Sequence, residues 1–158
     1  MTKLSLPALD PESAPRREGS GYPAPFREAV AARSWRTLGD ALGLTQFGVN
    51  LMTVPPGCWS SQRHWHSHED EFLYMLEGEL VLVTDGGEQV LGAGMAAGFP
   101  AGKADGHHLV NRGDRPATFL VVGTRATGQD ETFYPDIDLE VRVRDGREVY
   151  VHRSGEPY

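Results

Sequence analysis

Residues 57–78 read GCWSSQRHWHSHEDEFLYMLEG, and three of the six histidines of the chain alternate within this stretch, at His64, His66 and His68. Side chains two residues apart on a β-strand point to the same face, so His64 and His66 can converge on one point. Glu71 follows five residues after His66, far enough for a bend to return its carboxylate to that point. Imidazoles crowded on one strand face add little to packing. The spacing therefore favours a metal site over an ordinary set of surface or hydrogen-bonded histidines.

Two further histidines, His107 and His108, lie next to each other later in the chain. A strand that carries one of them could complete the group of ligands begun by the first stretch. Three neutral imidazoles and one carboxylate would leave a divalent ion with open coordination positions for water or a substrate.

The sequence around these histidines is typical of short strands joined by turns. Nineteen glycines and eleven prolines in 158 residues indicate many tight turns. The segments expected to form strands are residues 47–51, 72–83 with an interruption at Glu77-Gly78-Glu79, and 117–122. Hairpin turns are expected at Asp85-Gly86-Gly87 and Asp145-Gly146, with a C-terminal hairpin over 137–152. Many short strands at this spacing predict an all-β sandwich or barrel.

The first part of the chain has a different composition. Residues 1–24 are rich in proline and charge and are expected to form an extended or disordered N-terminal arm. Residues 25–35, PFREAVAARSW, are expected to form one short helix that begins at Pro25. Residues 25–158 are then expected to form a single domain, which the length of the chain allows.

Charge and cysteine content narrow the class of protein. Fifteen Lys and Arg against twenty-two Asp and Glu give a net charge of -7, which argues against nucleic acid and anionic membrane as partners. No apolar run approaches the roughly 20 residues that span a bilayer, and the first residues have no continuous apolar stretch typical of a secretory signal. The single cysteine, Cys58, excludes an intramolecular disulfide and agrees with a reducing compartment. We expect a cytoplasmic protein.

Residues 57–78 resemble the first motif of the cupin superfamily, with Gly57, the pair His64 and His66, Glu71 after four more residues and Gly78 after another six. Residues 94–111 resemble the second motif, and its elements here are Gly94, Pro100-Ala101-Gly102, His107 and Asn111. The chain has one extra residue before His64. It also has four residues, where the family has two, between Gly102 and the histidine, which leaves His107 and His108 as alternatives. The spacing to Asn111 favours His107.

The resemblance implies an all-β fold, the double-stranded β-helix or jelly-roll barrel of the cupins. It also implies that one divalent metal ion (Zn, Fe, Mn or Ni) is bound by His64, His66, Glu71 and His107. Asp70 would replace Glu71 if the shorter family spacing applied. Gly78 and Gly94 are expected in turns with positive φ.

Other residues near the motifs are candidates for supporting or substrate-binding roles. His68 shares the register of His64 and His66 and is expected at the rim or in support of a ligand. The cations Arg63, Lys103 and Arg112 could hold a substrate carboxylate or phosphate, although such residues are more often solvated surface. The aromatic residues, of which Tyr74 is also a candidate for substrate binding, are expected mainly in the core; they are Trp59, Trp65, Phe72, Tyr74 and Phe99. Trp65 is expected to point away from the metal.

The chain is similar to small single-domain cupins labelled sugar-phosphate isomerase-like. This similarity implies a metal-dependent enzyme that performs carbonyl chemistry, such as isomerisation, on a small polar metabolite. The alternatives are an iron-dependent dioxygenase or another cupin enzyme such as a lyase, and a non-catalytic sensor module that uses the metal to bind a small-molecule ligand. The resemblance also implies a homodimer, which removal of residues 1–24 is expected to weaken because the arm could cover a partner's sheet.

Overall fold

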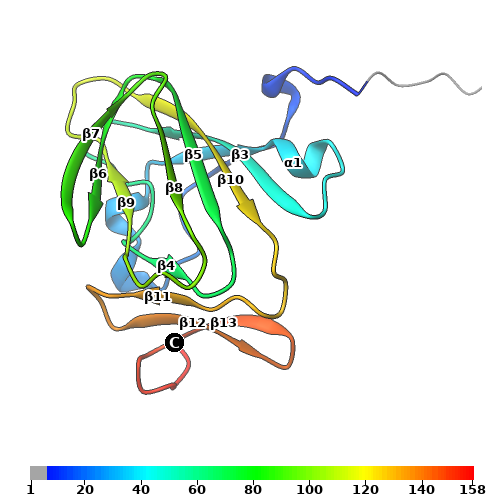
Figure 1. Ribbon diagram of the computed structural model, residues 1–158, viewed down its shortest axis with the longest axis vertical. Coiled ribbons are helices and arrows are strands. Elements are labelled where there is room, and N and C mark those ends of the chain that lie inside the picture. The colour runs from blue at the N-terminus through cyan, green and yellow to red at the C-terminus, as the bar shows by residue number, and fades with distance from the viewer. Residues whose placement is uncertain (1–6) are drawn as a thin grey trace, which may run out of the picture.

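The computed structural model describes residues 7–158, which hold thirteen strands, one α-helix and three short 3-10 helices (Figure 1). The helices are η1 (Pro11–Ser13), η2 (Ala24–Phe26), η3 (Glu28–Val30) and α1 (Leu38–Ala41). The strands are β1 (Arg16–Glu18), β2 (Ser34–Thr37), β3 (Phe47–Val54), β4 (Trp65–His66), β5 (Glu71–Glu77), β6 (Glu79–Thr84), β7 (Gly87–Gly92), β8 (Ala96–Phe99), β9 (His108–Val110), β10 (Ala117–Thr124), β11 (Thr132–Tyr134), β12 (Leu139–Arg144) and β13 (Arg147–Val151).

The strands form three antiparallel sheets that build a barrel. One sheet has six strands in the order β1-β2-β3-β10-β5-β8, and a second has three in the order β7-β6-β9. The third, β13-β12-β11-β4, crosses the lower end of the barrel (Figure 1). This arrangement is the expected all-β jelly-roll. Within the described residues, no helix is long and apolar enough to span a membrane.

The main core fills the space between the six-stranded and three-stranded sheets. Its buried members from the first sheet include Leu73, Met75 and Phe119, and those from the second include Leu80 and Leu82. Burial of this apolar area provides the main driving force for closing the barrel, at about 25 cal/mol per Å². The packing of Leu73 and Met75 also determines which face of β5 points into the barrel. Glu71 lies on that same face by alternation.

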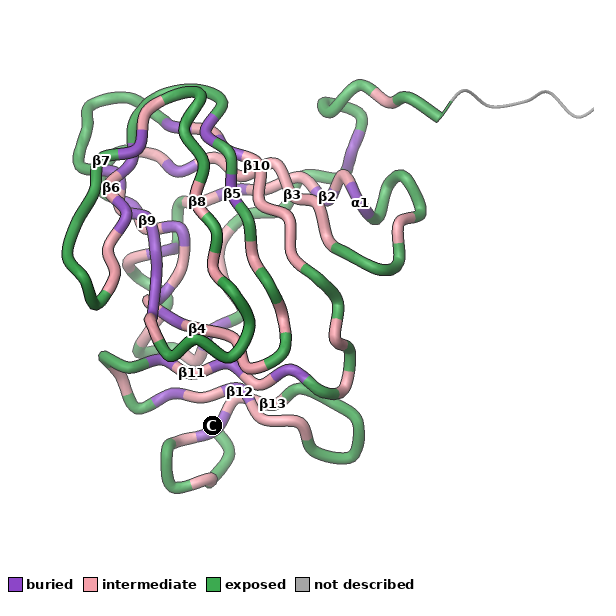
Figure 2. Tube along the Cα trace, viewed as in Figure 1, coloured by how far each residue is buried: buried purple, intermediate pink, exposed green. Residues whose placement is uncertain are grey.

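The outer face of β5 carries apolar side chains that remain exposed. Phe72 and Tyr74 are 45% and 40% exposed, whereas Leu73 and Met75 between and after them are buried (Figure 2). The expectation that Phe72 and Tyr74 belong to the core is therefore wrong. Side chains alternate along a strand, and β5 has apolar residues on both of its faces.

A second core joins the N-terminal segment to the C-terminal hairpin. Tyr22 and Val30 pack there with Tyr134, Leu139 and Val141. The rings of Tyr22 and Tyr134 meet edge to face with their centroids 5.7 Å apart. Of the expected N-terminal arm, residues 1–6 lie outside the described residues, while β1 pairs with β2 at the edge of the large sheet.

The helix expected over residues 25–35 is a misprediction. The structure has the two turns η2 and η3 there, followed by β2, and its α-helix lies at α1 instead. An isolated helix of this length is marginal, because the first turn is costly to nucleate. Pairing of Ser34 with Thr53 and of Trp35 with Met52 in the β2–β3 ladder provides the competing hydrogen bonds.

The predicted turns occur where the glycines require them. Gly78 has a φ of 76° and separates β5 from β6, and Gly94 has a φ of 85°. Asp145 and Gly146 both have positive φ, at 51° and 73°, as a two-residue turn between β12 and β13 demands.

Candidate metal centre

The two histidine groups meet because the backbone pairs them directly. His64, just before β4, and His107, just before β9, form an isolated antiparallel bridge. In this bridge the N–H of each residue donates to the carbonyl of the other, at 3.1 and 2.9 Å. His66 follows in β4, and Glu71 is the first residue of β5. Two motifs that are separate in the sequence thus converge on one side of the barrel interior.

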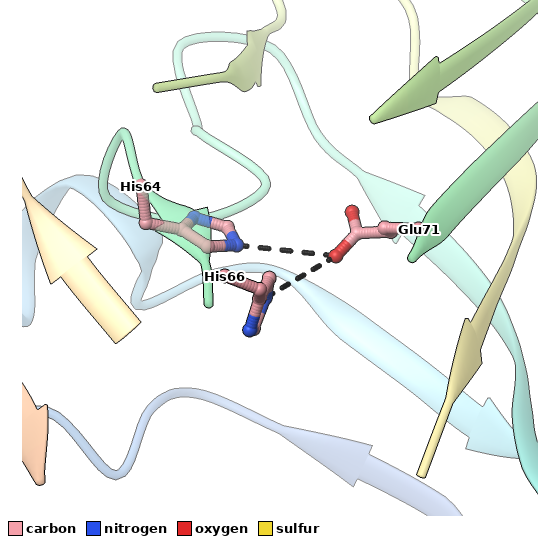
Figure 3. Close-up of side chains that lie close together, drawn as sticks. All are labelled: His64, His66 and Glu71. Carbon is pink, nitrogen blue, oxygen red and sulfur yellow. Dashed lines mark ion pairs between the residues drawn. The ribbon is translucent and has the colours of Figure 1, made fainter. Parts of the chain in front are cut away.

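The Glu71 carboxylate lies at the centre of three imidazoles. Its Oε1 is 3.2 Å from Nε2 of His107. Its Oε2 is 3.6 Å from Nε2 of His66 and 3.9 Å from Nε2 of His64 (Figure 3). The ligand atoms of His64, His66 and Glu71 all lie within 4.8 Å of one another. The three histidines therefore present the same ring nitrogen to one small volume.

Burial and neighbouring charge act against each other at these groups. Burial raises the pKa of Glu71, but hydrogen bonds from His107, His64 and His66 outweigh it and hold that pKa well below its usual range. Burial lowers the pKa of His66, yet its hydrogen bonds with Asp130 and Glu71 raise it to about 10. Burial also lowers the pKa of His107 and keeps this imidazole neutral at pH 7. The cluster thus combines an ionised carboxylate with imidazoles of unequal basicity.

The donor set fits a divalent cation. The outer nitrogens of two imidazoles are held by protein groups, since Nδ1–H of His64 donates to the Gln62 carbonyl at 2.8 Å and Nδ1–H of His66 donates to Asp130 at 2.7 Å. These bonds fix the ring orientations and leave each Nε2 free to ligate. Mixed imidazole and carboxylate ligands suit Zn, Fe, Mn and Ni alike.

The structure places His107, and not His108, against Glu71. His108 donates through Nδ1 to the Ser61 carbonyl at 3.0 Å, and its ring meets Trp59 edge to face. The ring of His107 is stacked on Phe99, with centroids 3.5 Å apart. Its Nδ1 is buried and has no hydrogen-bond partner among residues 7–158. His107 is accordingly the histidine that completes the group around Glu71.

Asp70 and His68 lie away from the cluster. The exposed Asp70 carboxylate accepts from the N–H of Ala101 at 2.8 Å, so it closes a loop and does not replace Glu71. His68 is exposed and its Nδ1 lies 2.7 Å from the Ser67 hydroxyl. The regular strand alternation ends after His66, which turns the His68 side chain outward.

The flanking cations have partners of their own. Arg63 forms ion pairs with Asp85 and Asp136, and Arg112 pairs with Glu88 on the surface. Lys103 is exposed, 3.9 Å from Asp105, and lines a cavity beside the cluster. Tyr74 lies on the outer face of the sheet. The ring of Trp65 stacks on Phe133, and Trp65 lines the same cavity as Lys103.

Asp130 is a site residue that the sequence analysis missed. It lies between β10 and β11 and is 4% exposed. Besides His66, its carboxylate accepts from the N–H groups of His68 and Glu69, at 2.8 and 3.2 Å. It therefore ties the ligand loop to the C-terminal part of the chain. No motif marks it, because only the sheet topology brings it beside His66.

Two cavities meet at the cluster. One, of about 330 Å³, lies within the barrel and is lined by all four candidate ligands. The other, of about 340 Å³, lies beside Trp65, Phe99 and Lys103. His66, Glu69 and His107 line both. Glu69 was also missed by sequence reasoning; it accepts from the N–H of Ala126 at 2.8 Å, and burial raises its pKa.

Comparisons with known proteins agree with this architecture. Residues 50–123 match the family model described as a cupin domain. The chain is 47% identical to a sugar phosphate isomerase from a cupin superfamily of Silicibacter pomeroyi, over 96% of both chains with a TM-score of 0.91. It is 30% identical to a putative sugar phosphate isomerase of Acidithiobacillus ferrooxidans, over 81% of both chains with a TM-score of 0.72.

A more distant structure shares the fold alone. The polyketide cyclase RemF of Streptomyces resistomycificus is 21% identical, over 76% of this chain and 80% of its own, with a TM-score of 0.60. No curated protein matches the chain.

Proposed function

Because the chain belongs to the cupin superfamily, we propose that it is a divalent-metal-dependent enzyme that isomerises a small sugar phosphate or a related hydroxycarbonyl compound. The observation that carries the proposal is the convergence of three imidazole Nε2 atoms on the half-buried Glu71 carboxylate. Two similar structures, described as sugar phosphate isomerases, support the choice of reaction.

The metal would be held by His64, His66, Glu71 and His107. When bound, it would polarise a carbonyl oxygen and so acidify the neighbouring C–H group. The protein contributes a fixed ligand geometry through the Gln62 carbonyl and Asp130, which orient two of the imidazoles. The barrel cavity of about 330 Å³ limits the substrate to a small metabolite.

Glu69 is our candidate for moving the proton. Its side chain lines both cavities at the cluster, and one carboxylate oxygen is fixed by the N–H of Ala126. Burial raises its pKa, which makes its carboxylate a stronger base. Glu69 would take the proton from the carbon that bears the hydroxyl and return it to the former carbonyl carbon, while the hydroxyl proton passes to the carbonyl oxygen. Atoms and charge then balance with no oxidant.

Proton exchange with solvent tests this function. Protein loaded in turn with Zn, Fe, Mn and Ni is incubated in D₂O with aldose phosphates from triose to hexose, and deuterium at the carbon beside the carbonyl is followed by NMR. We expect metal-dependent exchange with at least one substrate. Glu69→Gln is expected to keep its metal and lose about a hundredfold or more of the exchange rate.

The matched control is Glu77→Gln, which removes an exposed carboxylate from the far end of β5 and should exchange like the wild type. Absence of exchange with every metal and substrate would contradict the proposed reaction. Full exchange in Glu69→Gln would contradict the role of Glu69 alone.

A further inference from the structure

The barrel cavity has a cationic end. The inward face of β10 carries Phe119, Val121 and Gly123, all of which line the cavity, and Arg125 continues this alternation just beyond the strand. Within residues 7–158, Arg125 is the only lysine or arginine that lines the cavity containing the candidate metal centre. The carboxylates on the same lining belong to Glu69 and Glu71.

Two glycines open the wall between Arg125 and the metal centre. In the β3–β10 ladder Gly48 pairs with Gly123, and in the β10–β5 ladder Gly123 pairs with Glu71. A Cβ atom at Gly48 would lie 3.7 Å from Nε and 3.8 Å from Nη2 of Arg125. Because Gly48 has no side chain, β3 leaves Nε of Arg125 uncovered at this position.

The remaining edge of the guanidinium is held in place. Nη1 donates to the Leu44 carbonyl at 3.1 Å, and Nη2 pairs with the Asp40 carboxylate. Nε has no hydrogen-bond partner among the described residues. The Asp40 side chain is 48% exposed, so solvent screens the pair, which orients Arg125 more than it neutralises it. A fixed guanidinium with a free N–H is suited to bind an oxyanion.

We propose that Arg125 binds the terminal phosphate of the substrate while its carbonyl end lies at the metal centre. This assignment rests on the proposed function. The guanidinium lies beside Gly48, and Gly48 and Glu71 flank Gly123 in the two neighbouring strands, so the backbone positions at the two ends of the site are roughly 10 Å apart across the sheet. That separation selects a short open-chain substrate with an anionic group at the end opposite the carbonyl, and disfavours the same sugar without phosphate.

Sugar acids test this site without turnover, because their hydroxycarboxylate end can bind the metal. Calorimetric titrations of the Mn-loaded protein compare three pairs: glycerate with 3-phosphoglycerate, erythronate with 4-phosphoerythronate, and ribonate with 5-phosphoribonate. In the wild type the phosphate should increase affinity about tenfold to a hundredfold for at least one chain length. No increase for any pair would overturn the proposal.

Variants separate Arg125 from other causes of phosphate preference. Arg125→Gln should abolish the increase and leave the affinity for the unphosphorylated acid unchanged. Gly48→Val should reduce the increase, since its side chain would contact Nε. Arg147→Gln, which removes an exposed arginine from β13, is the matched control and should behave like the wild type. Thermal melts check that each variant is folded, and Gly48→Val supplies a second route if Arg125→Gln fails to fold.

The outcomes also separate this site from the proposed reaction. Phosphate preference that depends on Arg125, without deuterium exchange, would support the anion site and contradict the isomerase. The opposite outcome is that Arg125→Gln exchanges deuterium at the wild-type rate and still binds the phosphorylated acids more tightly. That outcome would support the isomerase and overturn the role of Arg125. A terminal carboxylate in place of phosphate, supplied as ribarate, shows whether any anion suffices: equal affinity for ribarate and 5-phosphoribonate would overturn the assignment to phosphate.

Discussion

At the scale of single residues, the geometry of the candidate metal centre depends on the imidazoles and also on the groups that hydrogen-bond to the Nδ1 atoms of His64 and His66. His66 places one nitrogen toward Glu71 and the other on Asp130, at 3.6 and 2.7 Å. Asp130 is held in turn by the N–H groups of His68 and Glu69. A carboxylate in this position fixes the tautomer of the histidine and raises its basicity as a ligand.

We predict that Asp130→Asn lowers metal affinity about tenfold to a hundredfold, because the charge behind His66 is lost while an acceptor oxygen is kept. Competition with a chromophoric chelator measures the affinity. Asp138→Asn, which removes an exposed carboxylate bonded to His152, is the control and should not change it. Wild-type affinity in Asp130→Asn would show that Asp130 only closes the loop.

The pKa of His66 predicts how metal binding responds to pH. With this pKa raised to about 10, the imidazole of the metal-free protein carries a proton at neutral pH. Binding of an ion at Nε2 must displace that proton, so about one proton is released per metal and affinity rises with pH. Calorimetry in buffers of different ionisation enthalpy, between about pH 6 and about pH 8, measures the release. Affinity that is flat or falls with pH would contradict this account.

Single residues also show which parts of the candidate site can be predicted from the sequence alone. His64, His66 and Glu71 could be predicted as a group, because alternation on a strand and a short bend are local features. Asp130 and Arg125 could not be predicted, since they reach the site only through pairing of β10 and β11 with strands distant in the sequence. At His68 the local alternation is no longer informative, because β4 ends at His66 and the His68 side chain is exposed.

At the scale of elements, glycines with positive φ form the turns that connect strands of the barrel. Gly78 separates β5 from β6 at a φ of 76°, and an added Cβ would lie 2.8 Å from Cα of Ala117. Gly94 has a similar φ of 85°, but a Cβ there would approach only the Tyr74 hydroxyl, at 4.0 Å. A residue with a side chain would therefore be strained by the backbone φ at both positions, but only at Gly78 would its Cβ also clash with a neighbouring strand.

We predict that Gly94→Ala lowers the free energy of unfolding by about 1 kcal/mol, the cost of a left-handed residue with a side chain. Gly78→Ala should cost about 3 kcal/mol or more, since the backbone of β10 must also move. Chemical denaturation of both variants measures the difference. Equal losses would show that strain alone, without the close contact at Ala117, sets the cost.

The elements predicted from alternation and turn residues were found, whereas the helix over residues 25–35 was not. Its apolar residues satisfy a helical pattern, but Val30 is instead buried in the second core and Ser34 begins a strand that pairs with β3. The local sequence pattern does not show whether a helix of this length is more stable than strand pairing and burial with residues distant in the sequence.

At the scale of the whole molecule, the N-terminal segment is part of the fold of its own chain. Tyr22 is buried against Tyr134 and Tyr150, and β1 completes the large sheet. Removal of residues 1–24 would therefore expose core and destabilise the protein, whatever its effect on assembly. The division of the chain at residue 24 stays a prediction.

The homodimer likewise stays a prediction, and the full-length chain tests it better than a truncation does. We expect sedimentation of the wild type at micromolar concentration to give twice the mass of one chain. A single-chain mass throughout that range would contradict the homodimer and would leave the metal centre unaffected, because all four candidate ligands come from one chain.

The central claim is that His64, His66, Glu71 and His107 hold a divalent metal ion. Elemental analysis of protein purified without chelators or a histidine-rich tag tests it most directly, on the wild type, His66→Ala and His68→Ala. The last two remove the same side chain at neighbouring alternate positions, one within the cluster and one exposed. We predict close to one metal per chain in the wild type and in His68→Ala, and its loss in His66→Ala. No metal in the wild type, before or after titration with Zn, Fe, Mn and Ni, or equal metal in all three proteins, would contradict the account.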